Sequence, residues 1–185
     1  MRWKGASTGT SILSLDLAAT LRRLKPQKVR GPLARRSDDA LPFVAEPVGA
    51  GPVLLLDTTV YIDTLQGRLP DEVGKLLTLR QLDHSSVALA ELAHAFGRLD
   101  PAHPGTAGAL RAIEAVIAAV PVHRLAAPSV QATVEAGIIA GTVARLRGLA
   151  KTDRQPLFND AALFLQALEG GSTLLTRNIA DLDLL

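Results

Sequence analysis

A run of four aliphatic residues at positions 53–56, VLLL, limits the folds that this chain can adopt. No polar residue alternates into the run, so it predicts a short strand that is buried on both faces. Strands of this kind belong to parallel sheets that are covered by helices on each side. The run leads directly into Asp57. A carboxylate at the end of a buried strand requires a cation, a hydrogen-bond network or an opening to solvent.

Strand and helix patterns alternate along the rest of the chain. Helical periodicity, capping residues and helix breakers predict helices at residues 58–65, 71–82, 89–99, 106–120, 128–148 and 158–171. Short apolar runs predict three further strands, at 84–88, 122–125 and 172–176. Strands that alternate with helices in this way indicate an α/β fold with a parallel sheet between two helical layers.

Charge and composition divide the chain near residue 50. Residues 1–50 contain nine Lys or Arg and four acids, a net charge of +5, whereas residues 51–185 contain 11 bases and 14 acids, a net charge of −3. The segment AEPVGAGP reads as a linker between the two parts. We therefore predict a basic N-terminal extension, residues 1–50, and one folded domain, residues 51–185. The extension is either a poorly ordered tail, with a short amphipathic helix in SILSLDLAATLRRL, or an arm that binds nucleic acid or a partner.

Two classes of protein are disfavoured by composition. The chain has no cysteine, which excludes disulfides and thiolate metal sites. No apolar run reaches the roughly 18–20 residues that span a bilayer, and the N-terminal apolar stretch is interrupted by Ser14 and Asp16, which argues against a secretory signal. We expect a cytoplasmic protein without a membrane partner.

Acidic and amide side chains follow several of the predicted strands. In a parallel α/β sheet, functional groups collect beyond the carboxyl ends of the strands. The residues that share this position are Asp57, Glu91 in the helix after the second strand, Asp160 near the start of the helix at 158, and Asn178 after the fourth strand, with Asp181 and Asp183 behind it. Several oxygen ligands without His or Cys suit a hard cation such as Mg²⁺ or Mn²⁺. The four histidines, His84, His94, His103 and His123, lack ligand spacing on one helix face and are interpreted as structural or exposed.

Three stretches of the sequence resemble motifs of the PIN-domain ribonucleases, and especially of the VapC-type toxins of type II toxin–antitoxin pairs. LLLDTTVYID resembles the opening motif, SSVALAELAHAF the second, and LFNDAALFLQALEGGSTLLTRNIADLDLL the third and fourth. The resemblance covers residues 52–185 in the right order. It implies a PIN-like three-layer α/β/α fold with a short central parallel sheet, and a Mg²⁺-dependent endoribonuclease.

The resemblance also implies roles for individual residues. Asp57, Glu91 and Asp160 match the metal-site acids of the family. Position 178 matches a fourth acid but is asparagine here, and Asp181 is the candidate to compensate as a metal ligand. The remaining candidates are Thr58 and Thr176, which would orient water or ligands, and Arg177, which would contact phosphate unless it is an ordinary solvated arginine.

The partners that the resemblance implies are an RNA substrate, a small antitoxin protein and a second copy of the chain. Apolar residues of the helices at 71–82 and 87–98 would form the floor of a groove for an antitoxin helix, unless they pack inward as core; they are Val73, Leu76, Leu77, Leu89, Leu92 and Phe96. Two alternatives stay open. A haloacid-dehalogenase phosphatase would need a second aspartate at position 59, which is threonine. A catalytically weak PIN domain that binds RNA or protein is compatible with Asn178.

Overall fold

The structure is a computed structural model that describes residues 15–41, 49–149 and 154–185. The predicted extension and linker lie partly outside these ranges, at residues 1–14 and 42–48. The elements, in chain order, are α1 (Leu17–Leu24), a 3₁₀ turn (Asp38–Ala40), β1 (Leu54–Leu56), α2 (Thr58–Leu65), α3 (Asp71–Leu79), β2 (Leu82–Ser85), α4 (Ser86–Arg98), α5 (Thr106–Ala119), a second 3₁₀ turn (Val122–Arg124), β3 (Leu125–Ala126), α6 (Val130–Arg147), α7 (Arg154–Gly170), β4 (Thr173–Leu175) and α8 (Ile179–Leu182).

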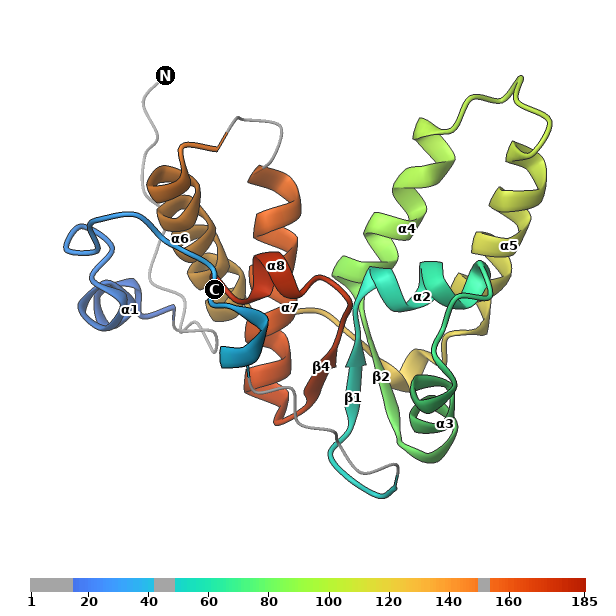
Figure 1. Cartoon of the computed structure of the whole chain (residues 1–185), viewed down its shortest axis with the longest axis horizontal. Coiled ribbons are helices and arrows are strands. Elements are labelled where there is room, and N and C mark those ends of the chain that lie inside the picture. Colours follow the sequence, from blue (N-terminus) through green and yellow to red (C-terminus); the bar gives the residue numbers. More distant parts are fainter. Residues whose placement is uncertain (1–14, 42–48, 150–153) are drawn as a thin grey trace, which may run out of the picture.

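The described strands form one parallel sheet in the order β3-β2-β1-β4, which confirms the predicted α/β class (Figure 1). Leu54 in β1 pairs with Leu82 in β2 and with Thr173 in β4. The first strand is therefore interior, and all three of its residues are buried, as the unbroken aliphatic run predicts. Because the strands are parallel, their carboxyl ends meet at one edge of the sheet.

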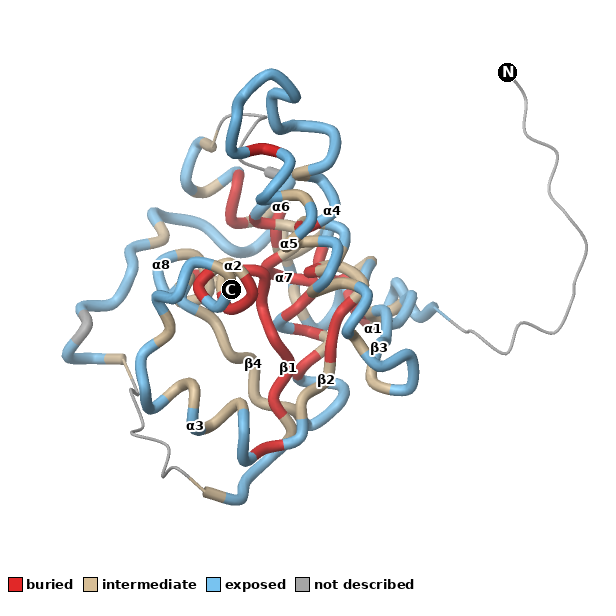
Figure 2. The backbone as a smooth tube through the Cα atoms, turned by 90° about the vertical axis from the view of Figure 1, so that its right-hand side faces the viewer, coloured by how far each residue is buried: buried red, intermediate tan, exposed pale blue. Residues whose placement is uncertain are grey.

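Helices cover both faces of the sheet. In Figure 1, the sheet separates α6 and α7 from α2, α3 and α5, and α4 and α5 extend together beyond the strand ends. Figure 2 shows the buried residues concentrated along β1 and the helices beside it. One cluster of buried side chains joins β1 to α2, α4 and α7, and a second lies between α6 and α7. No helix in the described ranges has the length and apolarity needed to cross a bilayer.

Several predicted boundaries were wrong. The second strand begins at Leu82 and ends at Ser85, whose hydroxyl accepts the N–H of Val87 at 3.1 Å and so caps α4. The third is mostly a 3₁₀ turn that leaves only Leu125–Ala126 in the sheet. Helix α7 begins at Arg154 instead of near 158. Pro156 lies in its first turn, where a proline is tolerated because the backbone N–H groups of that turn have no partner within the helix.

The histidines lie as predicted. His84 is buried in β2, and its Nδ1 is 2.6 Å from the hydroxyl of Tyr61, so it belongs to the structural core. His94, His103 and His123 are exposed.

Candidate functional site

Asp57 occupies the strand-to-helix turn at the carboxyl end of β1. It is 4 % exposed, and it caps the N-terminus of α2. Its Oδ1 accepts the N–H of Thr58 at 2.6 Å, and its Oδ2 accepts the hydroxyls of Thr59 and Thr176, each at 2.7 Å. Three donors thus satisfy a buried carboxylate, and Thr176 joins it to the end of β4.

Glu91 lies in α4 and is held from two sides. One carboxylate oxygen accepts a hydrogen bond from the hydroxyl of Thr58 in α2. The other accepts the side-chain amide of Asn159 in α7 at 2.6 Å. The glutamate therefore connects α2, α4 and α7 at the same edge of the sheet as Asp57.

Asp160 and Asn178 meet across α7 and the β4–α8 turn. The amide nitrogen of Asn178 donates to Asp160 at 2.9 Å and to Asp181 at 3.2 Å. The backbone N–H of Asn178 donates to the Thr176 hydroxyl at 2.9 Å, which ties this turn to Asp57. Asp160 is 8 % exposed and lies nearly two turns into α7, so its predicted place in the first turn of that helix was wrong. Hydrogen bonds through Thr58 and Thr176 connect these residues into one network, here called the acid cluster (Asp57, Glu91, Asp160, Asn178 and Asp181).

The acid cluster brings several negative charges close together. The pKa of Asp160 is raised to about 7, first by burial and then by the negative charges of Asp57, Asp181 and Glu91, while the bond from Asn178 opposes the rise. None of the ion pairs of the described residues involves Asp57, Glu91 or Asp160. Among the described residues, Arg147 pairs with Asp181 of the cluster, at 3.4 Å. A positive charge at the cluster would therefore relieve the repulsion.

The donor chemistry of the cluster fits a hard divalent cation, since all of its acidic groups offer carboxylate oxygens. Its arrangement is not a ready ligand cage: within the described residues, no three His, Asp or Glu side chains are placed to hold one metal ion. The carboxylate oxygens instead face hydroxyl and amide donors of the protein, namely Thr58, Thr59, Asn159, Thr176 and Asn178. A cation would have to replace some of these hydrogen bonds.

Two other predicted residues lie beside the cluster without joining it. The guanidinium of Arg177 pairs with buried Asp63 at 3.1 Å, and Arg68 pairs with the same carboxylate at 3.2 Å. Arg177 nevertheless remains 60 % exposed, which leaves it accessible at the rim. Asp183 pairs with Arg36 at 2.6 Å.

Two residues of the network were missed in the sequence. Thr59 binds Asp57, and Asn159 binds Glu91. Their positions in the sequence could have indicated them, because Thr59 follows Thr58 in DTT and Asn159 precedes Asp160 in FND. The pairing of Asn159 with Glu91 joins residues 68 positions apart and has no local signature.

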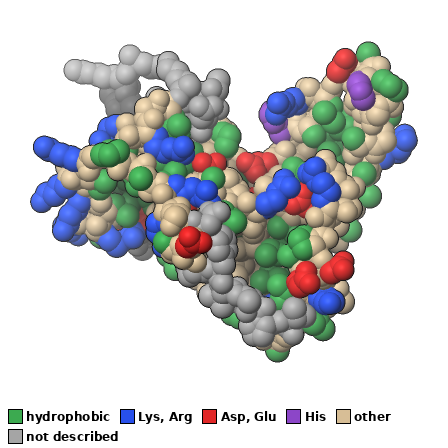
Figure 3. Space-filling model, viewed as in Figure 1, with side chains coloured by type: hydrophobic (Ala, Val, Ile, Leu, Met, Phe, Trp, Pro, Cys, Tyr) green, Lys and Arg blue, Asp and Glu red, His purple; other side chains and the backbone are tan. Residues whose placement is uncertain are grey.

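Cavities open on both sides of Glu91. A cleft of about 770 Å³ between α4 and α7 is lined by Glu91 and Asn159 together with the polar side chains of His94, Arg98 and Gln155. A more apolar groove between α2, α4 and α5 is lined by Thr58, Ile62, Leu65, Gln66, Glu91, Leu92, Ala95, Leu99, Ala109, Ala112 and Ile113. Figure 3 shows acidic side chains at the floor of the hollow between the α6–α7 pair and the α4–α5 pair.

The groove differs from the predicted one in its lining. Of the six apolar residues expected there, only Leu92 lines it, and Leu92 is buried. Phe96 is 45 % exposed but lies outside it, and the other four are partly buried against the core or at its edge. The inward-packing alternative therefore describes most of them.

Of the comparisons with known proteins, only the one with solved structures found a similarity. No protein-family model matches the chain, and no curated protein sequence matches it. The chain is similar to a structure of VapBC2 from Rickettsia felis bound to a DNA fragment from their promoter, with 18 % identity over 70 % of this chain and 90 % of that one and a TM-score of 0.49. It is also similar to VapBC-1 from nontypeable Haemophilus influenzae, with 23 % identity over 71 % and 91 % of the two chains and a TM-score of 0.46. At these values the similarity concerns the path of the chain and assigns no function.

Proposed function

We propose that this protein is a Mg²⁺-dependent endoribonuclease of the PIN-domain type, a hydrolase of RNA phosphodiesters, and that it acts in the cytoplasm as the toxin of a toxin–antitoxin pair. The observation that carries the proposal is the acid cluster. Its carboxylates come from three helices and one strand end, and they lie close enough for their charges to raise the pKa of Asp160. A buried set of like charges is costly unless a cation or a proton compensates it. Clusters of this kind are typical of sites that bind a metal ion and a phosphate.

Asp57, Glu91, Asp160 and Asp181 would hold the metal ion. When bound, Mg²⁺ or Mn²⁺ supplies an activated water and neutralises charge on the phosphate. The chain's own residues orient the ligands: hydroxyls of Thr59 and Thr176 fix the Oδ2 of Asp57. The pKa of Asp160, about 7 without metal, would fall when a cation binds, so that this carboxylate would be ionised in the loaded site.

Other residues would position the substrate. Arg177, whose side chain is exposed, would contact a phosphate. The cleft between α4 and α7 offers polar groups from His94, Arg98 and Gln155 to the nucleotides beside the cut bond.

The proposal is tested by RNA cleavage assays in Mg²⁺, in Mn²⁺ and in EDTA. Asp57→Asn and Asp160→Asn keep the shape of the side chains and remove a ligand charge. We expect each to lose more than the roughly 10–100-fold that removal of an outer-shell partner costs. Asp71→Asn is the matched control, because Asp71 is an exposed aspartate in the first turn of α3. Cleavage that persists in EDTA, or that survives both substitutions, would refute the assignment.

A second candidate function is favoured by one observation. Asn178 occupies the centre of the acid cluster, where the resembled family has an acid, and it donates to two carboxylates that could otherwise bind metal. A PIN-like domain of this kind could bind RNA or protein without cutting it. RNA binding that is equal with and without Mg²⁺, with no cleavage in either condition, would favour this binding module over the nuclease.

We further propose that the apolar groove beside Glu91 receives a helix of an antitoxin, and that the protein forms a homodimer. The groove joins apolar side chains to an acidic one, which suits an amphipathic helix that carries a basic residue. Ala95→Arg fills the groove, and Val122→Arg is the matched control because Val122 is 86 % exposed elsewhere. The product of an adjacent reading frame should inhibit the control and fail to inhibit Ala95→Arg. Equal inhibition of both would place the partner elsewhere, and light scattering of the isolated chain gives its oligomeric state.

A further inference from the structure

Part of the basic N-terminal segment is docked on the folded domain. Helix α1 packs against α6, and Thr20, which is 1 % exposed, donates its hydroxyl to Glu135 at 3.1 Å. The amide of Gln131 donates to both Thr20 and Glu135, and the guanidinium of Arg23 pairs with the same glutamate. Thr20 and Glu135 are buried, and the hydrogen bond between them joins residues more than 100 positions apart. It therefore fixes α1 in one place.

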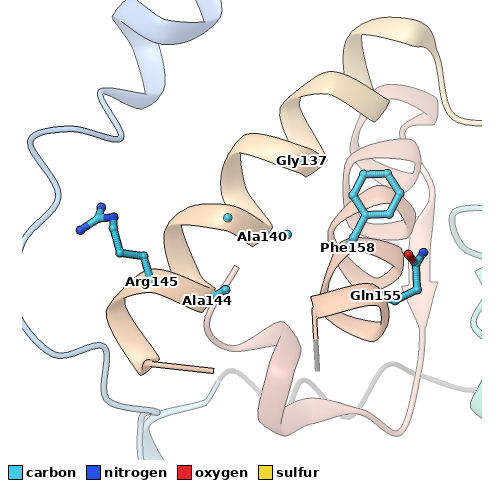
Figure 4. A pocket seen from close by; sticks show the side chains of 7 residues that line it. Gly137, Ala140, Ala144, Arg145, Gln155 and Phe158 are labelled. Carbon is cyan, nitrogen blue, oxygen red and sulfur yellow. The ribbon is translucent and has the colours of Figure 1, made fainter. Parts of the chain in front are cut away.

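Two arginines hold the chain that follows α1. The guanidinium of Arg145 donates to the carbonyls of Pro26 and Val29, at 3.0 and 3.2 Å. Figure 4 shows Arg145 pointing away from Phe158 and Gln155, which line the groove between α6 and α7, toward the N-terminal segment. Further along, Arg36 binds Asp183 through its side chain at 2.6 Å and through its backbone N–H at 2.7 Å. We refer to residues 17–36 as the docked arm.

The docked arm carries more cations than its attachment uses. Arg23 and Arg36 pair with acids of the domain. The side chains of Arg22, Lys25, Lys28 and Arg30 are exposed and make no hydrogen bond or ion pair with any other residue that the structure describes. Figure 3 shows Lys and Arg side chains gathered over the α1 side of the molecule. Unpaired surface cations that are held at fixed positions form a binding surface for anions.

Contacts at α8 connect the docked arm to the acid cluster. Arg36 holds Asp183 in the turn that ends α8, and Arg147 holds Asp181 in the same short helix. Asp181 in turn accepts the amide of Asn178 inside the cluster. The C-terminal end of the docked arm and the acid cluster are thus attached to the same short helix.

We propose that the docked arm binds the phosphates of the RNA substrate on one side of the cut site. This inference rests on the proposed ribonuclease function and extends it to the way in which the strand is held. Each phosphate that a cation neutralises releases counterions, so the arm would contribute a salt-dependent and sequence-independent part of the affinity.

RNA fits the arm better than an anionic membrane does. The four cations are spread over α1 and the irregular chain after it, and α1 has only eight residues. A helix that lies on a membrane needs a free apolar face. One face of α1 is already used against α6 through Thr20 and the partly buried Leu24, although Leu17 and Leu21 are exposed.

The test compares two matched double variants of the full chain. Lys28→Gln/Arg30→Gln removes one lysine and one arginine from the docked arm. Lys75→Gln/Arg111→Gln removes the same pair of charges from exposed positions on α3 and α5. Binding of a fluorescent single-stranded RNA is measured by anisotropy in EDTA, so that no cleavage interferes, over a series of KCl concentrations. Urea midpoints verify that both variants fold as the wild type does.

We expect the arm variant to reduce the slope of log K against log salt by about 1.4, because each phosphate contact on a single strand contributes roughly 0.7. The control should keep the wild-type slope. In cleavage assays the arm variant should raise KM with kcat unchanged, since it removes binding without touching the acid cluster.

Each outcome decides one claim. Equal slopes for the two variants would overturn the docked arm as an RNA surface, even if the protein cuts RNA. A reduced slope without any cleavage by the wild type would retain the arm and remove the nuclease. Loss of binding to vesicles with 30 mol % anionic phospholipid in the arm variant, with its RNA slope unchanged, would assign the surface to lipid and overturn the proposal.

Discussion

Replacing Asp160 by asparagine should stabilise the metal-free protein while it abolishes cleavage. The pKa of Asp160 is raised from 3.8 to about 7 in the folded state. The carboxyl therefore ionises at a lower pH in the unfolded chain than in the folded protein. The resulting stability is fully present below about pH 4 and is lost as the pH rises through about 7. The gap between the two pKa values corresponds to about 4 kcal/mol, and solvent at the open edge of the site reduces the expected effect to about 2–4 kcal/mol.

The assay is urea unfolding in EDTA at pH 4.5 and at pH 8.5. The free energy of unfolding of Asp160→Asn, relative to that of the wild type, should be about 2–3 kcal/mol larger at pH 8.5 than at pH 4.5. The reason is that the amide cannot ionise and still accepts the hydrogen bond from Asn178. The exposed control Asp71→Asn should show no such gain. Saturating Mg²⁺ should then stabilise the wild type and leave Asp160→Asn nearly unchanged. If Asp160→Asn is equally or less stable relative to the wild type at pH 8.5, the reasoning from carboxylate repulsion is refuted.

Three further predictions follow from named contacts. Asn178→Asp adds a fifth acid to the acid cluster and should tighten Mg²⁺ binding in a calorimetric titration; an unchanged affinity would place the residue outside the metal's ligands. Thr176→Val removes the hydroxyl that joins Asp57 to the Asn178 backbone and should lower the free energy of unfolding by about 1–3 kcal/mol, with no loss refuting that link. The pKa of Glu135 is held below its usual value, first by the hydrogen bond from Arg23, so its stabilisation is present above the unfolded-state pKa and is lost as the pH falls through the lowered folded value. Glu135→Gln should therefore expose α1 to limited proteolysis at pH 7, and wild-type protection in that variant would refute the anchoring role.

The class of fold was predictable because each decisive signal is local. An unbroken aliphatic run predicts a buried strand, and β1 is such a strand. The placement of Asp57, Glu91, Asp160 and Asn178 at one edge followed from the parallel direction of the strands, which sequence periodicity alone indicates.

The features that escaped prediction depend on distant partners. Leu82 belongs to β2 because it pairs with Leu54, and nothing within HSSVA indicates that pairing. The start of α7 depends on the tolerance of a first helical turn for Pro156. The attachment of α1 depends on Glu135, which reads as an ordinary helix glutamate until Thr20 is placed beside it.

The pairing of β1 with β4 has a consequence for how the protein is made. Leu54–Leu56 and Thr173–Leu175 are neighbours in the sheet but are separated by more than 100 residues of chain, and contacts of such long range form late and slowly. During synthesis, β1 has one unpaired apolar side until β4 leaves the ribosome, and the nascent chain is prone to aggregation in that interval. The bond from Thr176 to Asp57 and the entry of Asn178 among the carboxylates await the same event. Under the proposed function, a ribosome-bound fragment that lacks β4 should therefore not cleave RNA.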